Sequence, residues 1–312
     1  MDDTAAFPMS AKGIPTLDGP LMRRVAWAAV GVAGFLILLK AIAYIVTGSI
    51  AVMASLADSG LDLVGSTINL LAVSHALAPA DREHRFGHGK AEPLAGLAQG
   101  AFIAGSATFL VVESVSRLVS PRPIEHGAVG LFVMGVSIAA VIALVAIQRL
   151  AVARTGSIAI GADSIHYLGD VLTNAGVILG IVASIHFGWL AADPIVGLLV
   201  AATLSISAWF VFRQSYDQLM DHELPEQARV RVKQIVMRHA DVVSLHDLRT
   251  RAAGVSTFIQ LHLELDPALS LTRAHEVSDA VEADIHAAFP HAEVIIHQDP
   301  AGVEAPPPLA QS

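Results

Sequence analysis

Six long apolar segments fill the first two-thirds of the chain and limit what it can fold into. A segment of roughly 20 apolar residues is long enough for one helix to cross the hydrocarbon core of a bilayer. Charged residues make up only 15% of the 312 residues, whereas soluble domains carry about 25%. The sequence therefore predicts a polytopic α-helical membrane protein with six transmembrane helices. The apolar segments run at about 25–46, 49–77, 94–119, 127–147, 158–187 and 190–212.

Lysine and arginine residues beside these segments predict the orientation of the chain in the membrane. Cytoplasmic loops carry an excess of both residue types. Arg117 and Arg122 flank the segments on one side, and eight basic residues flank them on the other. We therefore expect both termini in the cytoplasm, and we expect Lys40, near the outer end of the first segment, to extend toward the lipid headgroups. The eight inner residues are Arg23, Arg24, Arg82, Arg85, Lys90, Arg149, Arg154 and Arg213.

Two of the apolar segments carry pairs of ionisable residues at helical spacing. The second segment holds Asp58 and Asp62, which lie one turn apart on the same face of a helix. The fifth segment aligns with the second without a gap at an offset of 108 positions, and it has His166 and Asp170 where the second has its two aspartates. An aspartate at the centre of a bilayer costs about 2.5–3.5 kcal/mol on insertion scales, so such residues usually serve a function. We expect these four side chains to bind one divalent cation.

The predicted topology gives this repeat a geometric meaning. The second and fifth segments run in opposite directions, as in transporters built from inverted repeats. Asp58 lies nine residues, or about 13 Å, from Ser49, and His166 lies nine residues from Ser157, so both pairs lie near the midplane. We expect Asp58 opposite Asp170 and Asp62 opposite His166, with Asp163 as a supporting partner. The alternative is that four separate polar residues form hydrogen bonds between neighbouring helices.

A polar connection with ligand-type residues lies between the second and third segments. Asp81, His84 and His88 are spaced like one helix face, but the neighbouring glycines and prolines favour a loop. The residues suit a small cytoplasmic metal site. They equally suit a solvated basic loop on the inner side, and spacing does not choose between the two.

The chain changes character after Phe212 and becomes soluble in composition. We expect helices at 225–240 and 271–289, and strands at 243–251, 255–266 and 293–298. This α-β-β-α-β order suits a small open sheet covered by helices on one face. A core of this size is modest, which favours added stabilisation by dimerisation or metal. Eight of the fourteen histidines lie in this region. The strands carry His246, His262 and His297, Asp299 follows the last of them, and His275 lies on the second helix, so a metal site is plausible here.

These patterns predict four parts. They are a flexible cytoplasmic tail at 1–20, a six-helix transport domain at 21–213, a cytoplasmic metal-binding dimerisation domain at 214–300 and a disordered tail at 301–312. The chain has no cysteine, so any metal must be held by histidine nitrogen and carboxylate oxygen. The net charge of −9 argues against nucleic acid as a partner.

Six motifs resemble those of the cation diffusion facilitator family, over roughly residues 20–300. That resemblance implies a secondary active transporter, not an enzyme, that lies in the cytoplasmic (inner) membrane as a homodimer. It implies export of Zn²⁺ or Fe²⁺, with Cd²⁺, Co²⁺ and Mn²⁺ also open, in exchange for protons; the alternative is a transporter mainly for Fe²⁺ or Mn²⁺. The motifs are SLADSGLDL at 55–63, ADREHRFGHGKAE at 80–92, ADSIHYLGDV at 162–171, LHDLRTR at 245–251, IQLHLE at 259–264 and VIIHQDP at 294–300.

The resemblance also implies roles for individual residues. The four intramembrane residues match the family's transport site, and the three loop residues match a second site, although Arg82 and Glu83 vary from the expected pattern beside it. A cytoplasmic two-metal site would use His246, His262, His297 and Asp299, with Gln298 through its carbonyl and His275 from the other subunit. An interlock below the membrane would pair Lys90 with Asp221.

Two other classes of function compete with transport. A membrane-anchored metal sensor or scaffold would use the cytoplasmic histidines but would leave the intramembrane residues without a purpose. An intramembrane metalloprotease is disfavoured because the sequence contains no HExxH motif.

Overall fold

The computed structural model describes residues 18–47, 50–120, 128–187, 191–254 and 256–303. The tails were predicted at 1–20 and 301–312, and most of each, residues 1–17 and 304–312, lies outside the described residues. The described chain divides between Tyr216 and Asp217 into two compact units, and each is described by itself.

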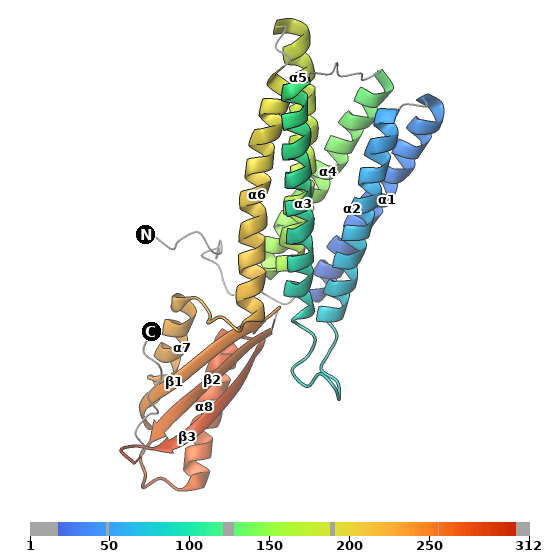
Figure 1. Ribbon diagram of the computed structural model, residues 1–312. Coiled ribbons are helices and arrows are strands. Elements are labelled where there is room, and N and C mark those ends of the chain that lie inside the picture. The colour runs from blue at the N-terminus through green and yellow to red at the C-terminus, as the bar shows by residue number, and fades with distance from the viewer. Residues whose placement is uncertain (1–17, 48–49, 121–127, 188–190, 255, 304–312) are drawn as a thin grey trace. The chain divides into compact units, whose positions relative to one another are not determined.

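Six long helices form the first unit, as predicted (Figure 1). The shortest has 27 residues and the longest 30, so at 1.5 Å per residue each is long enough to cross a bilayer. Among the described residues, every helix except α5 also contains a continuous stretch that is apolar enough to cross a membrane. The predicted α-helical membrane domain is confirmed. The helices are α1 (Gly19–Thr47), α2 (Ile50–Ala76), α3 (Ala91–Val119), α4 (Ala128–Thr155), α5 (Ile158–Phe187) and α6 (Ala192–Leu219).

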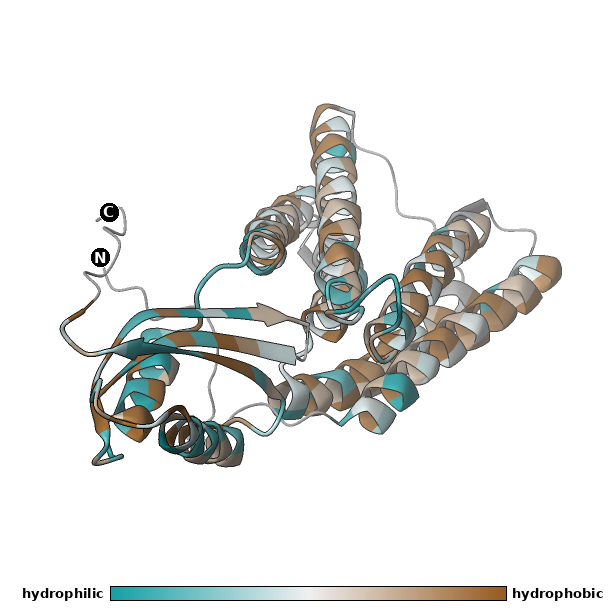
Figure 2. Cartoon of the chain, turned by 90° about the horizontal axis from the view of Figure 1, so that it is seen from below, coloured by the Kyte–Doolittle hydropathy of each residue, from teal (hydrophilic) through white to brown (hydrophobic). Residues whose placement is uncertain are grey.

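Large apolar side chains of this unit point outward, which suits a surrounding lipid phase. Trp27, Phe109 and Trp209 are all more than 60% exposed, and apolar residues cover the helices in Figure 2. The interior combines apolar side chains with some buried polar groups. The large side chain of Tyr167, for example, is fully buried among alanine, leucine and valine side chains of α1 and α4. Buried polar groups inside an apolar exterior are what a membrane helix bundle with an internal site requires.

The second unit has the predicted order α-β-β-α-β, and that prediction is confirmed. In the sheet, β1 and β2 are antiparallel, while β2 and β3 are parallel and are joined by the crossover helix α8. The elements are α7 (Glu226–Val236), β1 (Val242–Ala253), β2 (Ser256–Leu265), α8 (Leu271–Ala288) and β3 (Ala292–Pro300).

Alternation along β2 separates the two faces of this sheet. Ile259, Leu261 and Leu263 are buried in one apolar core with residues of α7 and α8, as expected when every second side chain points the same way. Gln260 and His262 therefore lie on the opposite face. Both helices cover one side of the sheet, and the other side remains available to polar side chains.

Candidate metal centres

The intramembrane site joins α2 to α5. His166 Nε2 lies 3.1 Å from Asp62 Oδ1 and 4.0 Å from Asp170 Oδ2. One ligand atom from each of the three residues lies within 4.8 Å of the others, which is close enough for one cation to contact all three. The repeat predicted that Asp62 would face His166, and the structure places them together.

The fourth predicted member, Asp58, lies outside this close group. Its side chain is exposed, although it interacts electrostatically with Asp62 and His166. Asp58 is one turn from Asp62 on α2, so a change of its side-chain rotamer or a small shift of the helix would bring its carboxylate toward the group. The structure thus brings together three of the four predicted residues.

A buried polar network supports the site from α4 and α5. Gln148 Nε2 donates to Asp163 Oδ2 at 2.7 Å, and both side chains are almost fully buried. This hydrogen bond therefore joins α4 to α5, one turn before His166 on α5. Sequence analysis singled out Asp163 but missed Gln148, because an isolated glutamine in an apolar segment carries no spacing signal.

The structure corrects the prediction for Lys40. We expected its side chain to extend toward the lipid headgroups, but it is only 8% exposed. Its ammonium donates to Ser59 Oγ at 2.6 Å and to the Ser55 carbonyl at 3.1 Å. The expectation was wrong because these α2 acceptors, in a helix that carries two carboxylates, hold the charge inside the bundle.

The second cluster lies in the loop between α2 and α3. Asp81 Oδ1 accepts the backbone N–H groups of His84 at 2.6 Å and Glu83 at 2.8 Å, while Asp81 Oδ2 lies 3.3 Å from His88 Nε2. The hydrogen bond from His84 is the main cause that lowers the pKa of Asp81. Asp81, His84 and His88 form a group with metal-ligand spacing. A third imidazole that sequence analysis missed, that of His75, packs against His88.

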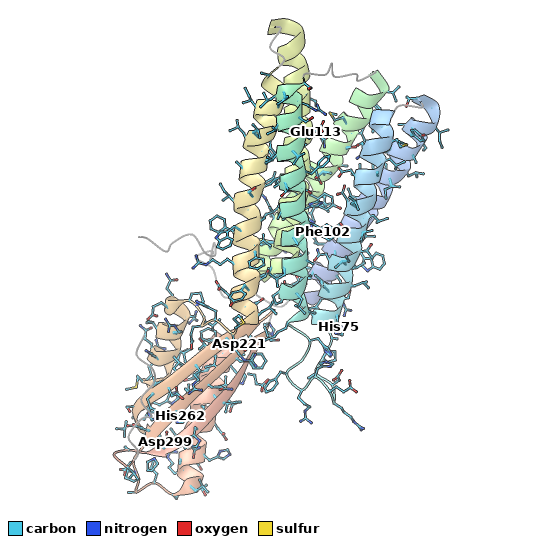
Figure 3. All side chains as sticks on the ribbon, viewed as in Figure 1. His75, Phe102, Glu113, Asp221, His262 and Asp299 are labelled. Carbon is cyan, nitrogen blue, oxygen red and sulfur yellow. The ribbon has the colours of Figure 1, made fainter. Side chains whose placement is uncertain are left out.

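The third cluster lies on the face of the three-stranded sheet opposite α7 and α8. His246, His262 and His297 occupy one row across the three strands, because β1 pairs His246 with His262 and β3 pairs His297 with His262. Figure 3 labels His262 and Asp299 on this sheet. Asp299 Oδ2 lies 2.8 Å from His262 Nδ1 and 3.3 Å from His246 Nε2. Asp299 Oδ1 lies 3.1 Å from His297 Nε2.

Asp299 is therefore placed to bridge two cation positions, with one carboxylate oxygen facing each of them. Burial acts to raise its pKa, but the hydrogen bond from His262 and the neighbouring imidazoles outweigh burial and lower the pKa overall. An ionised carboxylate between histidines is a suitable ligand for one or two divalent cations. His246, His262 and Asp299 form the close group, and His297 adjoins it.

Each cluster contains one buried atom that makes no hydrogen bond within the described chain. Buried polar groups rarely lack a hydrogen bond, and a bound cation, with small local adjustments, would supply a partner in all three places. The atoms are Asp170 Oδ2 in the membrane site, His88 Nδ1 in the loop and His246 Nδ1 in the sheet. Of these, His246 Nδ1 already lies 3.3 Å from Glu264 Oε1.

The remaining predicted residues are placed as follows. His275 lies on α8, exposed, with Nδ1 3.6 Å from Asp279, and its role across a dimer stays a prediction. The Gln298 side chain donates to Ser278 Oγ at 2.8 Å and to the Ala274 carbonyl at 3.4 Å, both on α8, and the role of its backbone carbonyl stays a prediction. Asp221 accepts from Arg251 at 3.1 Å. Lys90 belongs to the other unit, and its interlock with Asp221 also stays a prediction.

Known proteins resemble this chain along most of its length. Residues 26–220 match the cation efflux transmembrane domain, and residues 224–301 match the cytoplasmic domain of cation efflux proteins. The cation-efflux pump FieF of Shewanella oneidensis is 46% identical over 277 residues, which cover 89% of this chain and 93% of that protein. FieF of Escherichia fergusonii is 43% identical over 285 residues, which cover 91% and 95% respectively.

A solved structure of CzrB in its Zn form matches 27% of this chain and 98% of its own length, at 29% identity and a TM-score of 0.26. That score is too low for a comparison of folds, so the assignment rests on the domain matches and the FieF relatives. The resemblance seen in the motifs is confirmed. The chain belongs to the cation efflux family, the cation diffusion facilitators, and is a multi-pass membrane transporter for metal cations.

Proposed function

We propose that this protein exports Zn²⁺ or Fe²⁺ from the cytoplasm across the inner membrane in exchange for protons. The observation that carries the proposal is the approach of Asp62, His166 and Asp170 between two helices related by the repeat. Three ionisable groups together inside a bilayer are costly unless a cation or protons neutralise them. Asp58 would complete the site when a cation draws its carboxylate in.

The chemistry of the ligands links metal to protons. Carboxylate and imidazole bind a metal only when deprotonated, so the two kinds of cation compete for one site. An imidazole has an ordinary pKa near 6.5, which suits this exchange near neutral pH. The metal enters from the cytoplasm and displaces protons, and rocking of the helices exposes the site to the other side. Protons then release the metal and return inward.

The cytoplasmic unit would sense the metal and strengthen a homodimer. Two observations support this role: the match to a cation efflux cytoplasmic domain and the bridging position of Asp299 between imidazoles. His275 of the second subunit and the Gln298 carbonyl would complete the two-metal site. Both termini lie in the cytoplasm in this proposal, as the distribution of basic residues predicts.

The choice of metal follows from the ligand set. One imidazole and three carboxylates suit Zn²⁺ and also accept Fe²⁺, Mn²⁺, Co²⁺ and Cd²⁺. A transporter mainly for Fe²⁺ or Mn²⁺ is the second candidate, because the carboxylates outnumber the single nitrogen ligand.

The test is metal flux into proteoliposomes across a panel of these ions, with an imposed pH gradient. Asp62→Ala and Asp170→Ala should each abolish transport while helix content and elution from a sizing column stay unchanged. Glu113→Gln is the matched control, because that carboxylate pairs with Arg117 on α3 outside the site. Wild-type rates in either site variant would overturn the proposal. Binding without flux in the native protein would favour a sensor or scaffold.

A further inference from the structure

A third histidine lies beside the loop cluster. His75 is in the last turn of α2, at the end of the helix from which the loop continues (Figure 3). Its ring centroid is 4.4 Å from that of His88, and the two rings meet edge to face. The His84 ring centroid lies 4.7 Å from the same His88 ring. The imidazoles of His75 and His84 and the Asp81 carboxylate are therefore gathered around His88.

The loop group of Asp81, His84 and His88 is incomplete for a closed metal site. Zn²⁺ in a structural site takes four ligands, usually in a tetrahedron, and three protein ligands leave one position open. The His88 side chain is only 7% exposed, and its Nδ1 makes no hydrogen bond with the described residues. A buried imidazole with a nitrogen that makes no hydrogen bond adds little to the stability of a fold by itself. His75 is exposed, so its ring is free to turn.

We propose that His75 is the fourth ligand of the loop site, which then holds one divalent cation with three imidazoles and the Asp81 carboxylate. This inference rests on metal binding by Asp81, His84 and His88, and it does not depend on the proposed transport function. Three nitrogen donors and one oxygen donor favour Zn²⁺ and Co²⁺ over harder ions such as Mn²⁺ and Mg²⁺.

The position of His75 gives the fourth ligand a structural consequence. The other three ligands lie in the loop of residues 77–90, whereas His75 belongs to a helix. A metal bound by all four would fasten the loop to the end of α2. The same helix carries Asp62, thirteen residues earlier, about 20 Å along its axis. Arg82 and Arg85, which are exposed in this loop, would then become harder for trypsin to reach.

The experiment uses the full-length protein with the other two clusters disabled by Asp170→Asn and His262→Ala. Zn²⁺ affinity is measured by competition with a chelator, and Co²⁺ absorption reports the number and type of ligands. Trypsin cleavage at Arg82 and Arg85 is followed with and without Zn²⁺. His75→Phe keeps a ring against His88 but removes the nitrogens. It should weaken Zn²⁺ binding by about tenfold or more, change the Co²⁺ spectrum and reduce the protection from trypsin.

Two further variants make the result interpretable. His75→Gln tests the same loss with a polar side chain in case the phenylalanine disturbs folding, and it should also weaken binding. His286→Phe on α8 is the control and should bind as the parent does. The inference is overturned if both His75 variants bind like the parent while His88→Phe loses the metal, or if the parent loop binds no Zn²⁺. Absence of flux in the native protein, with binding that depends on His75, would instead overturn the proposed function alone.

Discussion

The ammonium group of Lys40 donates a hydrogen bond to Ser59 Oγ at 2.6 Å, across the contact between α1 and α2. Ser59 directly follows Asp58 in the chain, and the charge of Lys40 acts on Asp58, Asp62 and Asp170. A positive charge beside the proposed transport site would repel an entering metal ion. The same charge would compensate the carboxylates after the metal has left. We therefore expect Lys40 to favour release over tight binding.

Replacement of Lys40 by methionine removes this charge and keeps a side chain of similar length. At an effective dielectric constant near 20, a unit charge near a partly buried site changes the free energy of cation binding by about 1–2 kcal/mol. Without the Lys40 charge, Zn²⁺ should therefore bind roughly tenfold more tightly. Transport should slow, because release becomes harder. Calorimetry at pH 8 and flux in proteoliposomes measure the two effects. Lys40→Arg retains the charge and serves as the control. Unchanged or weaker Zn²⁺ binding in Lys40→Met would show that the charge does not act on the site.

The glycine pair Gly96 and Gly100 on α3 allows a test of helix packing. A Cβ atom at Gly96 would collide with Ser215 Oγ and would lie 2.9 Å from Ile158 Cγ2, whereas at Gly100 the nearest atom would be 3.5 Å away. Gly96→Ala should therefore destabilise the membrane unit by about 1–3 kcal/mol, the usual cost of overpacking. Gly100→Ala should be tolerated. Thermal unfolding in detergent compares the two, and equal melting temperatures would mean that α3 packs less closely against α5 and α6.

Local patterns predicted the elements of this protein well, because apolar segment length and strand alternation are properties of consecutive residues. The Asp62–His166 contact was also predictable, since the internal repeat supplied a geometric relation between distant helices. Hydropathy gives the depth of a residue in the membrane but not the direction in which its side chain points. For that reason Lys40 was wrongly predicted. His75 was missed because its neighbour His88 is brought to it by the fold of the loop.

The cytoplasmic sheet should lose stability in acid through Asp299. Its pKa is lowered in the folded protein, while an unfolded chain has an aspartate pKa of about 3.9. Its contribution is therefore complete above about pH 4 and is lost as the pH falls toward the folded value. In chelator-treated protein, hydrogen exchange in β2 and β3 should accelerate steeply below pH 4, once the intrinsic pH dependence of exchange is subtracted. Asp299→Asn should flatten that dependence, and Asp284→Asn on α8 should not. An unchanged profile in Asp299→Asn would contradict the assignment.

The hydrogen bond between Ser66 and Tyr167 predicts an asymmetry between two substitutions. The two hydroxyls are 2.7 Å apart, and both side chains are buried between α2 and α5. In Tyr167→Phe the serine hydroxyl can turn to a carbonyl of its own helix, so the loss should be about 1 kcal/mol. In Ser66→Ala the phenol keeps its buried hydroxyl without a partner, which should cost about 1–3 kcal/mol.

The double variant should therefore be about as stable as Tyr167→Phe alone, because the orphaned hydroxyl is gone. Unfolding in detergent and denaturant measures all three proteins, and the cycle isolates the coupling between the two side chains. Tyr216→Phe, at a half-exposed position on α6, should change stability by less than about 0.5 kcal/mol and controls for loss of a hydroxyl as such. If the stability losses of the two single variants simply add in the double variant, the two hydroxyls do not bond to each other. Other contacts would then hold α2 against α5.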